Sequence, residues 1–242
     1  LETGGSVLLL VDPVLARRDE NLAATGLSAL LGEWGVAIAD DVILDPSRAL
    51  AFMSPETFVV QQLPGHPATA HLAYEAVLVS AARSLAQLEP QENLRHSVLL
   101  ETSVDGWGET DLASLSSGAE RGSDDNLGPL PLAIAIERAE DETQADQEGE
   151  SRRGGRLIVI GDADLASNLL LDSASNRSLM INLVSWLLDE ERSLGVAPKD
   201  RQLTRLLLTG EQTLALGLTA TAGIPLMAVC LALATWWRRR KR

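Results

Sequence analysis

The C-terminal segment constrains the fold more strongly than any other part of this sequence. Thr213 to Trp237 are 25 consecutive residues without a charged side chain, and the cationic residues Arg238 to Arg242 follow directly. About 20 apolar residues are enough for a helix to cross the ~30 Å hydrocarbon core of a bilayer. A buried helix of a soluble protein is the alternative, but such helices rarely lack charge over this length. The segment therefore predicts one transmembrane helix over residues 212–237.

The flanks of this segment predict its orientation. Five consecutive cationic side chains resist translocation, so residues 238–242 are expected to form a cytoplasmic tail. Pro225 predicts a kink, which helices in lipid tolerate. The soluble part would then be extracytoplasmic on a single-pass protein of the bacterial inner (cell) membrane. The residues that define this anchor are Leu214 and Leu226 in the apolar run, Trp236 and Trp237 at the interface, and Arg238, Arg239 and Arg240 in the tail.

Charge and cysteine content exclude several classes of function. Without the five tail cations, 15 basic residues remain against 34 acidic ones, a net charge of −19. Such a domain lacks the cationic surface that nucleic-acid phosphates require. Cys230 is the one cysteine and lies inside the predicted span, so the soluble part has neither a disulfide nor a thiol nucleophile. A cysteine-free extracytoplasmic domain is compatible with a bacterial envelope protein.

Two apolar runs with the same pattern predict the centre of the fold. Gly4–Asp12 and Gly154–Asp162 each read as a glycine pair, an apolar run and an aspartate. Continuous apolar runs are typical of strands buried on both faces, as in parallel sheets. Strands and helices alternate between and after them, which indicates an α/β protein with an open, mostly parallel sheet flanked by helices. The further elements expected are a helix over 22–34, strands at 36–38, 42–44, 57–61, 97–101 and 132–137, a strand or helix at 76–79, and a helix capped by Asn176.

Composition divides the chain into four regions. Residues 1–193 are expected to form the α/β domain, 194–211 a connector, 212–237 the span and 238–242 the tail. Residues 137–153 contain seven acids and three arginines and are expected to be a disordered acidic loop. Leu1–Gly5 resembles the end of a helix with its glycine stop, which predicts a fragment that continues upstream.

Candidate binding residues follow the two central runs. Asp12, Asp162 and Asp164 would lie beyond the carboxyl ends of the strands, where ligands bind in open α/β sheets, and Asn168 follows in the next loop. Three carboxylates there could hold a divalent cation. Alternatively, Asp12 forms a turn with Pro13, and Asp162 and Asp164 cap the backbone that follows them.

Other catalytic and cofactor motifs are missing from the sequence. It contains neither a Gly-x-Ser-x-Gly elbow nor a phosphate loop followed by a lysine, so the chain is not itself an ATPase. His66 and His71 do not have the spacing of a zinc helix. We therefore expect no cofactor, no resident metal and no catalytic residue.

Several strings, taken in order, resemble one family. They are Gly4–Pro13, Gly65–Thr69, Ala82–Leu85, Trp107–Leu112, Gly128–Ala133, Gly155–Asn168 and Asn182–Leu187, together with the terminal span and basic tail. This pattern is similar to the GldG-like auxiliary component of an ABC-type transport system, a family associated with gliding motility. The resemblance implies a Rossmann-like domain related to the GIFT domain and to the glutamine-amidotransferase-like fold. It also implies ABC permease and ATPase subunits as partners.

These observations lead to one functional expectation and two alternatives. The chain is expected to be a non-enzymatic, membrane-anchored accessory subunit whose domain binds a partner subunit or cargo. One alternative is an anchored sensor that binds a small molecule or saccharide. The other is a carboxylate- or metal-dependent hydrolase that uses Asp12, Asp162 and Asp164.

Overall fold

A four-stranded mixed sheet forms the centre of the molecule. The computed structural model describes residues 5–16, 21–61, 63–72, 75–139, 154–189 and 208–240. In the central sheet, the strand order is β1 (Ser6–Leu10), β11 (Arg156–Ile160), β10 (Pro131–Arg138) and β7 (Leu94–Glu101). The two runs with the same sequence pattern are direct neighbours, paired in parallel from Ser6 with Arg156 to Leu10 with Ile160. The two runs are confirmed as neighbouring strands of one sheet, but β1 is the edge strand of this order and β11 alone of the two is internal.

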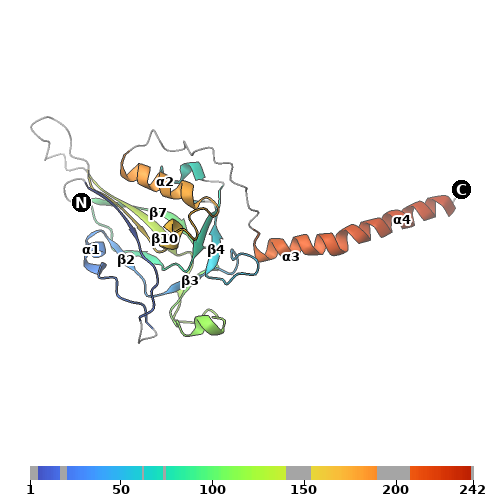
Figure 1. Ribbon diagram of the computed structural model, residues 1–242, viewed down its shortest axis with the longest axis horizontal. Helices are drawn as coiled ribbons and strands as arrows, with labels where there is room; N and C mark the ends of the chain where they lie inside the picture. The colour runs from blue at the N-terminus through green and yellow to red at the C-terminus, as the bar shows by residue number, and fades with distance from the viewer. Residues whose placement is uncertain are drawn as a thin grey trace, which may run out of the picture.

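Both faces of β11 and of the middle of β10 are buried, which explains the continuous apolar runs of these two strands. Ile158 and Ile160 of β11 face one core together with α2 (Asn176–Leu187). Leu157 and Val159 face the opposite core, which also contains α1 (Ser28–Glu33). Figure 1 shows α2 on one side of the sheet and α1 on the other. The helices therefore flank the sheet as the sequence predicts.

The sheet is not mostly parallel, and this expectation was wrong. Strand β10 pairs antiparallel with both β11 and β7, so only the β1–β11 pair of the central sheet is parallel. A parallel connection needs a crossover, usually through an amphipathic helix, and the polar sequence between β10 and β11 has no apolar stripe for one. A continuous apolar sequence such as Leu132–Ile136 indicates that both faces of the strand are buried. It does not indicate whether the strand runs parallel or antiparallel to its neighbours.

Three smaller antiparallel sheets surround the centre. They pair β2 (Val36–Ile38) with β6 (Leu85–Gln87), β4 (Thr57–Val60) with β5 (Val77–Ser80), and β8 (Trp107–Glu109) with both β3 (Val42–Leu44) and β9 (Asn126–Leu127). Short 3₁₀ helices at η1 (Ala70–Leu72), η2 (Ser114–Ser117) and η4 (Asp164–Ala166) complete the domain.

Two expected elements differ in extent. The helix expected over 22–34 is reduced to α1, since Leu22 forms a β-bridge with Leu15 and Gly26 has a φ of +71°. The loop expected from residue 137 begins later, because Glu137 and Arg138 still belong to β10. The remainder of that loop, from residue 140, lies outside the described residues. So do residues 1–4, most of the connector (194–207) and the end of the basic tail (241–242).

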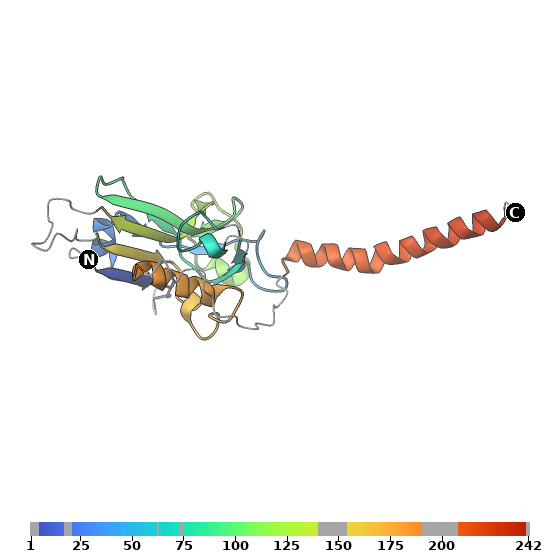
Figure 2. The same cartoon turned by 90° about the horizontal axis from the view of Figure 1, so that it is seen from above.

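The C-terminal segment is one long helix that projects away from the domain. It comprises α3 (Gly210–Leu218), a π-helical turn η6 (Thr219–Gly223) and α4 (Ile224–Arg240). These 31 residues have a mean hydropathy of 2.0 in their most apolar window, and none of that window is buried. The π turn ends two residues before Pro225, where the widened helix accommodates a residue that has no N–H to donate. Figure 2 shows a gentle bend through this region. The helix is long and apolar enough to cross a membrane.

Candidate functional site

The structure brings Asp12 and the Asp162–Asp164 turn together at the carboxyl ends of β1 and β11. The backbone ladder continues past β1, because the Val11 N–H donates to the Ile160 carbonyl at 2.9 Å. One residue later, the Asp12 carboxylate accepts a hydrogen bond from the Ala163 N–H at 2.5 Å. The sequence therefore predicted correctly that these acidic residues share one edge of the sheet.

Asp162 is the buried member of this group. One of its carboxylate oxygens accepts the Ser80 N–H at 3.0 Å, and the other accepts the N–H groups of Asp164 at 2.7 Å and Leu165 at 3.3 Å. Burial raises the pKa of Asp162 to about 7, as do the nearby charges of Asp12 and Asp164, while the N–H donors from Ser80 and Asp164 oppose the rise. The side chain thus caps η4 and ties it to the end of β5.

This geometry favours the capping alternative for Asp162. Both of its oxygens are occupied by backbone donors and it is 1 % exposed, so neither faces open solvent. Asp164 is half-buried and Asn168 is exposed. Within the described ranges, no cluster of three or more His, Cys, Asp or Glu side chains has the arrangement of a metal site. Ligand binding by Asp12, Asp162, Asp164 and Asn168 stays a prediction.

His66, like Asp162, is buried and accepts a hydrogen bond from a backbone N–H group. Its Nδ1 accepts the Ala68 N–H at 3.2 Å, and its ring lies edge-on to Trp186 with 4.9 Å between ring centroids. Burial lowers the pKa of His66, and the nearby Arg156 lowers it further, although Glu137 opposes them. A neutral, hydrogen-bonded imidazole in this position supports the fold.

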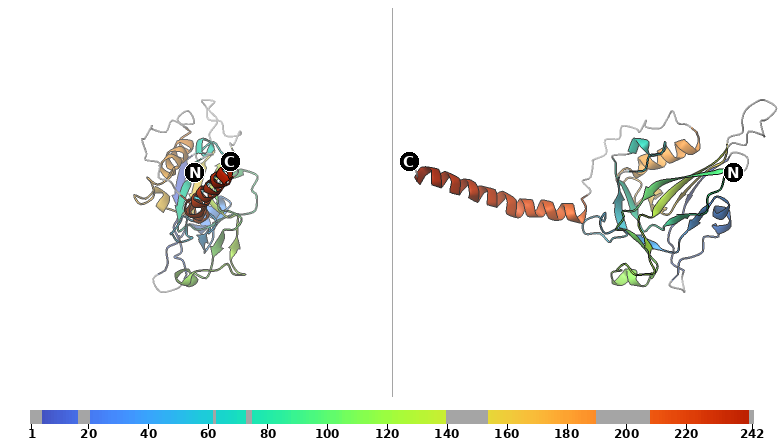
Figure 3. Two further views of the ribbon diagram at one scale, coloured as in Figure 1. Left: turned by 90° about the vertical axis from the view of Figure 1, so that its right-hand side faces the viewer. Right: turned by 180° about the vertical axis from the view of Figure 1, so that it is seen from behind.

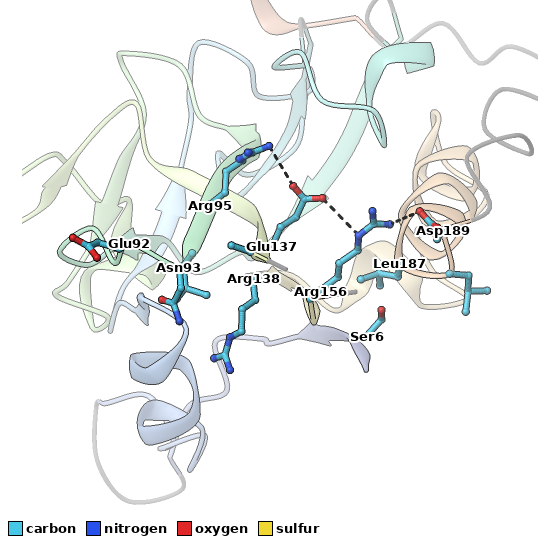
Figure 4. Close-up of a pocket in the computed structure, with 13 residues that line it drawn as sticks. Ser6, Glu92, Asn93, Arg95, Glu137, Arg138, Arg156, Leu187 and Asp189 are labelled. Atoms are coloured by element: carbon cyan, nitrogen blue, oxygen red, sulfur yellow. Dashed lines mark ion pairs between the residues drawn. The ribbon is translucent and has the colours of Figure 1, made fainter. Parts of the chain in front are cut away.

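A pocket of about 830 Å³ lies at the opposite edge of the central sheet. It is formed where β1 and β11 begin, where β7 begins and where β10 ends. Figure 4 shows a chain of ion pairs across it. Glu137 lies between Arg95, at 3.9 Å, and Arg156, at 3.6 Å, and Arg156 also reaches Asp189 at 3.3 Å.

Two arginines of the pocket are positioned on tryptophan rings. The Arg156 guanidinium lies 4.7 Å from the centre of the Trp186 ring and donates to the Trp186 carbonyl at 2.5 Å. The Arg138 guanidinium lies 4.6 Å from the centre of the Trp34 ring, and its buried Nε has no hydrogen-bond partner among the described residues. Stacking of this kind orients a guanidinium group while its N–H groups can still donate hydrogen bonds.

This pocket was not predicted from the sequence. Its charged residues lie at the outer ends of apolar strands, where a charge is ordinarily read as the end of the element. The available signal was that Arg95, Glu137, Arg138 and Arg156 each border a buried strand. Only the pairing of the strands shows that these ends meet.

Two further buried carboxylates were also missed. Asp41 accepts the Ser84 N–H at 2.9 Å, the Ser84 hydroxyl at 2.6 Å and the Asn126 amide at 2.7 Å. Asp45 joins the loops that contain Ser47 and Ser103, accepting hydroxyl hydrogen bonds of 2.8 Å from both. Each is fully buried and saturated with donors, so each stabilises loop positions.

Comparison with known proteins gives one family match. A family model described as "ABC-type uncharacterized transport system" matches residues 1–183. A solved structure titled "mmIFT52 N-terminal domain" matches with a TM-score of 0.49 and 16 % sequence identity, over 76 % of this chain. The chain spans 65 % of the length of that structure. No curated protein sequence matches significantly. Because the family match extends over most of the chain, this protein belongs to the family of auxiliary components of ABC-type transport systems.

Proposed function

We propose that this chain is a membrane-anchored, non-enzymatic accessory subunit of an ABC-type transport complex of the GldG-like, gliding-motility kind. The observation that carries the proposal is the exposed apolar helix Gly210–Arg240 on a chain of this family. A helix of this length and hydropathy needs an apolar environment, which lipid supplies. A phosphate loop is missing from the sequence, so the energy for transport comes from a separate ATPase subunit.

The orientation proposed follows from the charges beside the helix. Arg238–Arg240 end the helix, and Lys241 and Arg242 complete the basic tail. With this tail cytoplasmic, the α/β domain is extracytoplasmic at the bacterial inner membrane. A reporter fused to the C-terminus should be cytoplasmic, and replacing residues 238–242 with neutral residues should weaken that placement. An unchanged reporter position would show that other segments determine the topology.

The pocket at the amino ends of β1 and β11 is the proposed contact for a partner subunit or cargo. The start of β1, which borders the pocket, lies at the end of the central sheet away from α3 (Figure 1), so the pocket is open to molecules at a distance from the bilayer. Its three arginines are matched by the carboxylates of Glu92, Glu137 and Asp189. Such a mixed lining suits a polar or zwitterionic group better than a simple anion.

Co-purification tests the leading proposal. The tagged full-length chain, extracted in mild detergent from its own membrane, should bring down a permease and an ATPase. Arg156→Met should reduce recovery of these partners if the pocket is the contact. Arg177→Met is the matched control. Arg177 lies in the first turn of α2, away from the pocket, and forms an exposed ion pair with Asp172 in the preceding loop. Recovery of the tagged chain alone across several detergents and lipids would contradict the proposal.

The pocket itself supports a second candidate, an anchored sensor of a small molecule or saccharide. Guanidinium groups stacked on Trp34 and Trp186 provide directed donors for hydroxyl or carboxylate groups. Binding of a saccharide that Arg156→Met abolishes and Arg177→Met does not, without any co-purified transporter subunit, would favour this candidate. Hydrolysis through Asp12, Asp162 and Asp164 is less well supported, because Asp162 is enclosed by backbone donors.

A further inference from the structure

The base of the C-terminal helix is fastened to a loop of the domain. Leu50 and Thr209 form an antiparallel β-bridge, and the Ala51 N–H donates to the Leu208 carbonyl at 3.1 Å. Thr209 is also the N-cap of α3, in a reciprocal capping box with Gln212. The backbone of the domain and the first turn of the helix therefore meet at one point. Figures 1 and 3 show α3 leaving the domain beside the blue loop from this part of the chain.

This loop carries an unusually exposed aromatic residue. Residues Leu50–Met53 form a turn closed by a 3.1 Å hydrogen bond from the Met53 N–H to the Leu50 carbonyl. Phe52 is 99 % exposed, and Met53 is 53 % exposed. No residue from Ala49 to Pro55 carries a charge, although the chain as a whole is acidic. The tip of the turn is therefore an apolar, uncharged projection.

The backbone of Phe52, the third residue of this turn, has a conformation that a large side chain rarely adopts. Its φ is +66°, in the left-handed region that favours glycine. A bulky side chain is disfavoured there, and its full exposure means that the domain provides no packing in return. Residues held in such rarely populated conformations cluster at functional sites.

The position of the turn identifies what it contacts. The uncharged run begins at Thr213, four residues after Thr209, which is roughly 6 Å along a helix. The interfacial layer on each side of the hydrocarbon core is about 5–7 Å thick. The bridge to Leu50 thus holds the turn at the level of the lipid headgroups. Aromatic and long apolar side chains are the residues that bind at that depth.

We propose that Phe52 and Met53 insert into the interface of the same bilayer that the C-terminal helix crosses. The inference rests on the proposed membrane anchor. It gives the domain two membrane contacts, the helix and the Leu50–Met53 turn, joined by the bridge between Leu50 and Thr209. Two contacts fix the tilt of the domain on the membrane, whereas a single helix would let it swing. The pocket at the far end of the sheet is then held at a defined height above the bilayer.

Site-directed spin labelling of the full chain tests this proposal. Cys230 is the only cysteine, so Cys230→Ala provides a background for single labels. Labels at Phe52→Cys and Met53→Cys are compared with labels at two control positions, Leu226→Cys and Leu88→Cys. Leu226 lies in the proposed span. Leu88 is 43 % exposed and follows β6 beside Gly35, next to α1 at the far end of the domain.

The protein is reconstituted in phosphatidylcholine vesicles without partner subunits. We expect labels at Phe52 and Met53 to lose collisions with a water-soluble nickel complex and to gain collisions with lipid-soluble oxygen, relative to Leu88. Adding Phe52→Asp to the Met53→Cys chain should return that label to the behaviour of Leu88.

The controls separate the failure of this inference from the failure of the anchor. If the Leu226 label is in lipid while the labels at Phe52 and Met53 behave like Leu88, the second contact is overturned and the anchor stands. If the Leu226 label is also in water, both proposals fail. Shielding of Phe52 only after a permease is added would assign the turn to a protein partner and would also overturn the lipid contact.

Discussion

The side-chain amide of Asn176 pairs with both backbone polar groups of Leu78. Its oxygen accepts the Leu78 N–H at 2.9 Å, and its nitrogen donates to the Leu78 carbonyl at 2.8 Å. Asn176 is fully buried. Its amide makes the two backbone hydrogen bonds with β5 that a paired strand would otherwise make. The sequence predicted that Asn176 would cap α2, but no side-chain capping bond is present at that end of the helix, where the N-cap is Ser175.

Asn176→Ala should therefore destabilise the domain strongly. It leaves a buried N–H and a buried carbonyl without partners, each at a cost of about 1–3 kcal/mol. We expect a loss of roughly 2–4 kcal/mol in the free energy of unfolding, measured by urea denaturation in mild detergent. Arg177→Ala, at the neighbouring position, is the control variant. The ion pair of Arg177 with Asp172 is exposed and should contribute less than about 1 kcal/mol to the free energy of unfolding. Equal effects of the two substitutions would contradict the pairing.

Asp162 should make the stability of the protein depend on pH near neutrality. Its pKa is about 7 in the folded chain, against 3.8 when it is unperturbed. Between these values, the folded state binds more protons than the unfolded state, so stability falls as the pH rises. The contribution is fully present below about pH 4 and is lost as the pH passes through 7. Its slope approaches about 1.4 kcal/mol per pH unit inside this window.

Unfolding midpoints of the wild-type and Asp162→Asn chains, measured from pH 5 to pH 8, check this prediction. The substitution removes the titrating group, so the difference between the two chains should shrink as the pH rises. Asn retains one acceptor for the three backbone donors and is expected to cost some stability at every pH. A difference that does not change with pH would show that Asp162 ionises normally.

Gly161 should not tolerate a side chain. A Cβ at this position would lie 2.0 Å from the Arg83 carbonyl oxygen, and that oxygen belongs to the backbone and cannot rotate away. Arg83 and Gly161 are also joined by a 2.7 Å hydrogen bond from the Arg83 N–H to the Gly161 carbonyl. We expect Gly161→Ala to lower the free energy of unfolding by about 1–3 kcal/mol or more, because the backbone segments at Gly161 and Arg83 must move apart. Gly65→Ala is the control, since no atom lies within 4 Å of its added Cβ.

Phe52→Gly should separate folding from membrane contact. Glycine adopts the φ of +66° without strain, so the free energy of unfolding in detergent should stay unchanged or rise by up to about 1 kcal/mol. On vesicles, a label at Met53 should become more accessible to water, because the aromatic anchor is lost. Phe52→Ala is the companion variant, which removes the ring and retains the strain. A large loss of stability in Phe52→Gly would show that the ring supports the domain itself.

Much of the fold could be read from local sequence. The strands expected at 36–38 and 42–44 have those bounds, and those expected at 57–61, 97–101 and 132–137 are present with ends shifted by one to three residues. The stretch at 76–79, for which strand and helix were both open, forms β5 at Val77–Ser80. These elements were predictable because burial imposes an apolar pattern that can be counted along the chain.

The capping box of α3 was also readable but was overlooked. Thr209 followed three residues later by Gln212, just before an apolar run, is the usual signal for the start of a helix. The candidate pocket was different. Arg156 and Glu137 meet only because β10 and β11 pair antiparallel, and no local pattern distinguishes that arrangement from a parallel one.

The sequence by itself determined which segments are apolar, because hydrophobicity and charge are properties of each residue. The apolar helix Gly210–Arg240, the half-buried β1 and the buried β11 follow from composition alone. The tertiary structure decided which strand ends meet, that Asn176 completes the edge of β5, and that the Phe52 turn lies beside the root of the helix. These are contacts between residues far apart in the chain. These contacts depend on the direction and register of the strands, which backbone hydrogen bonding determines. The polarity of the side chains does not predict them.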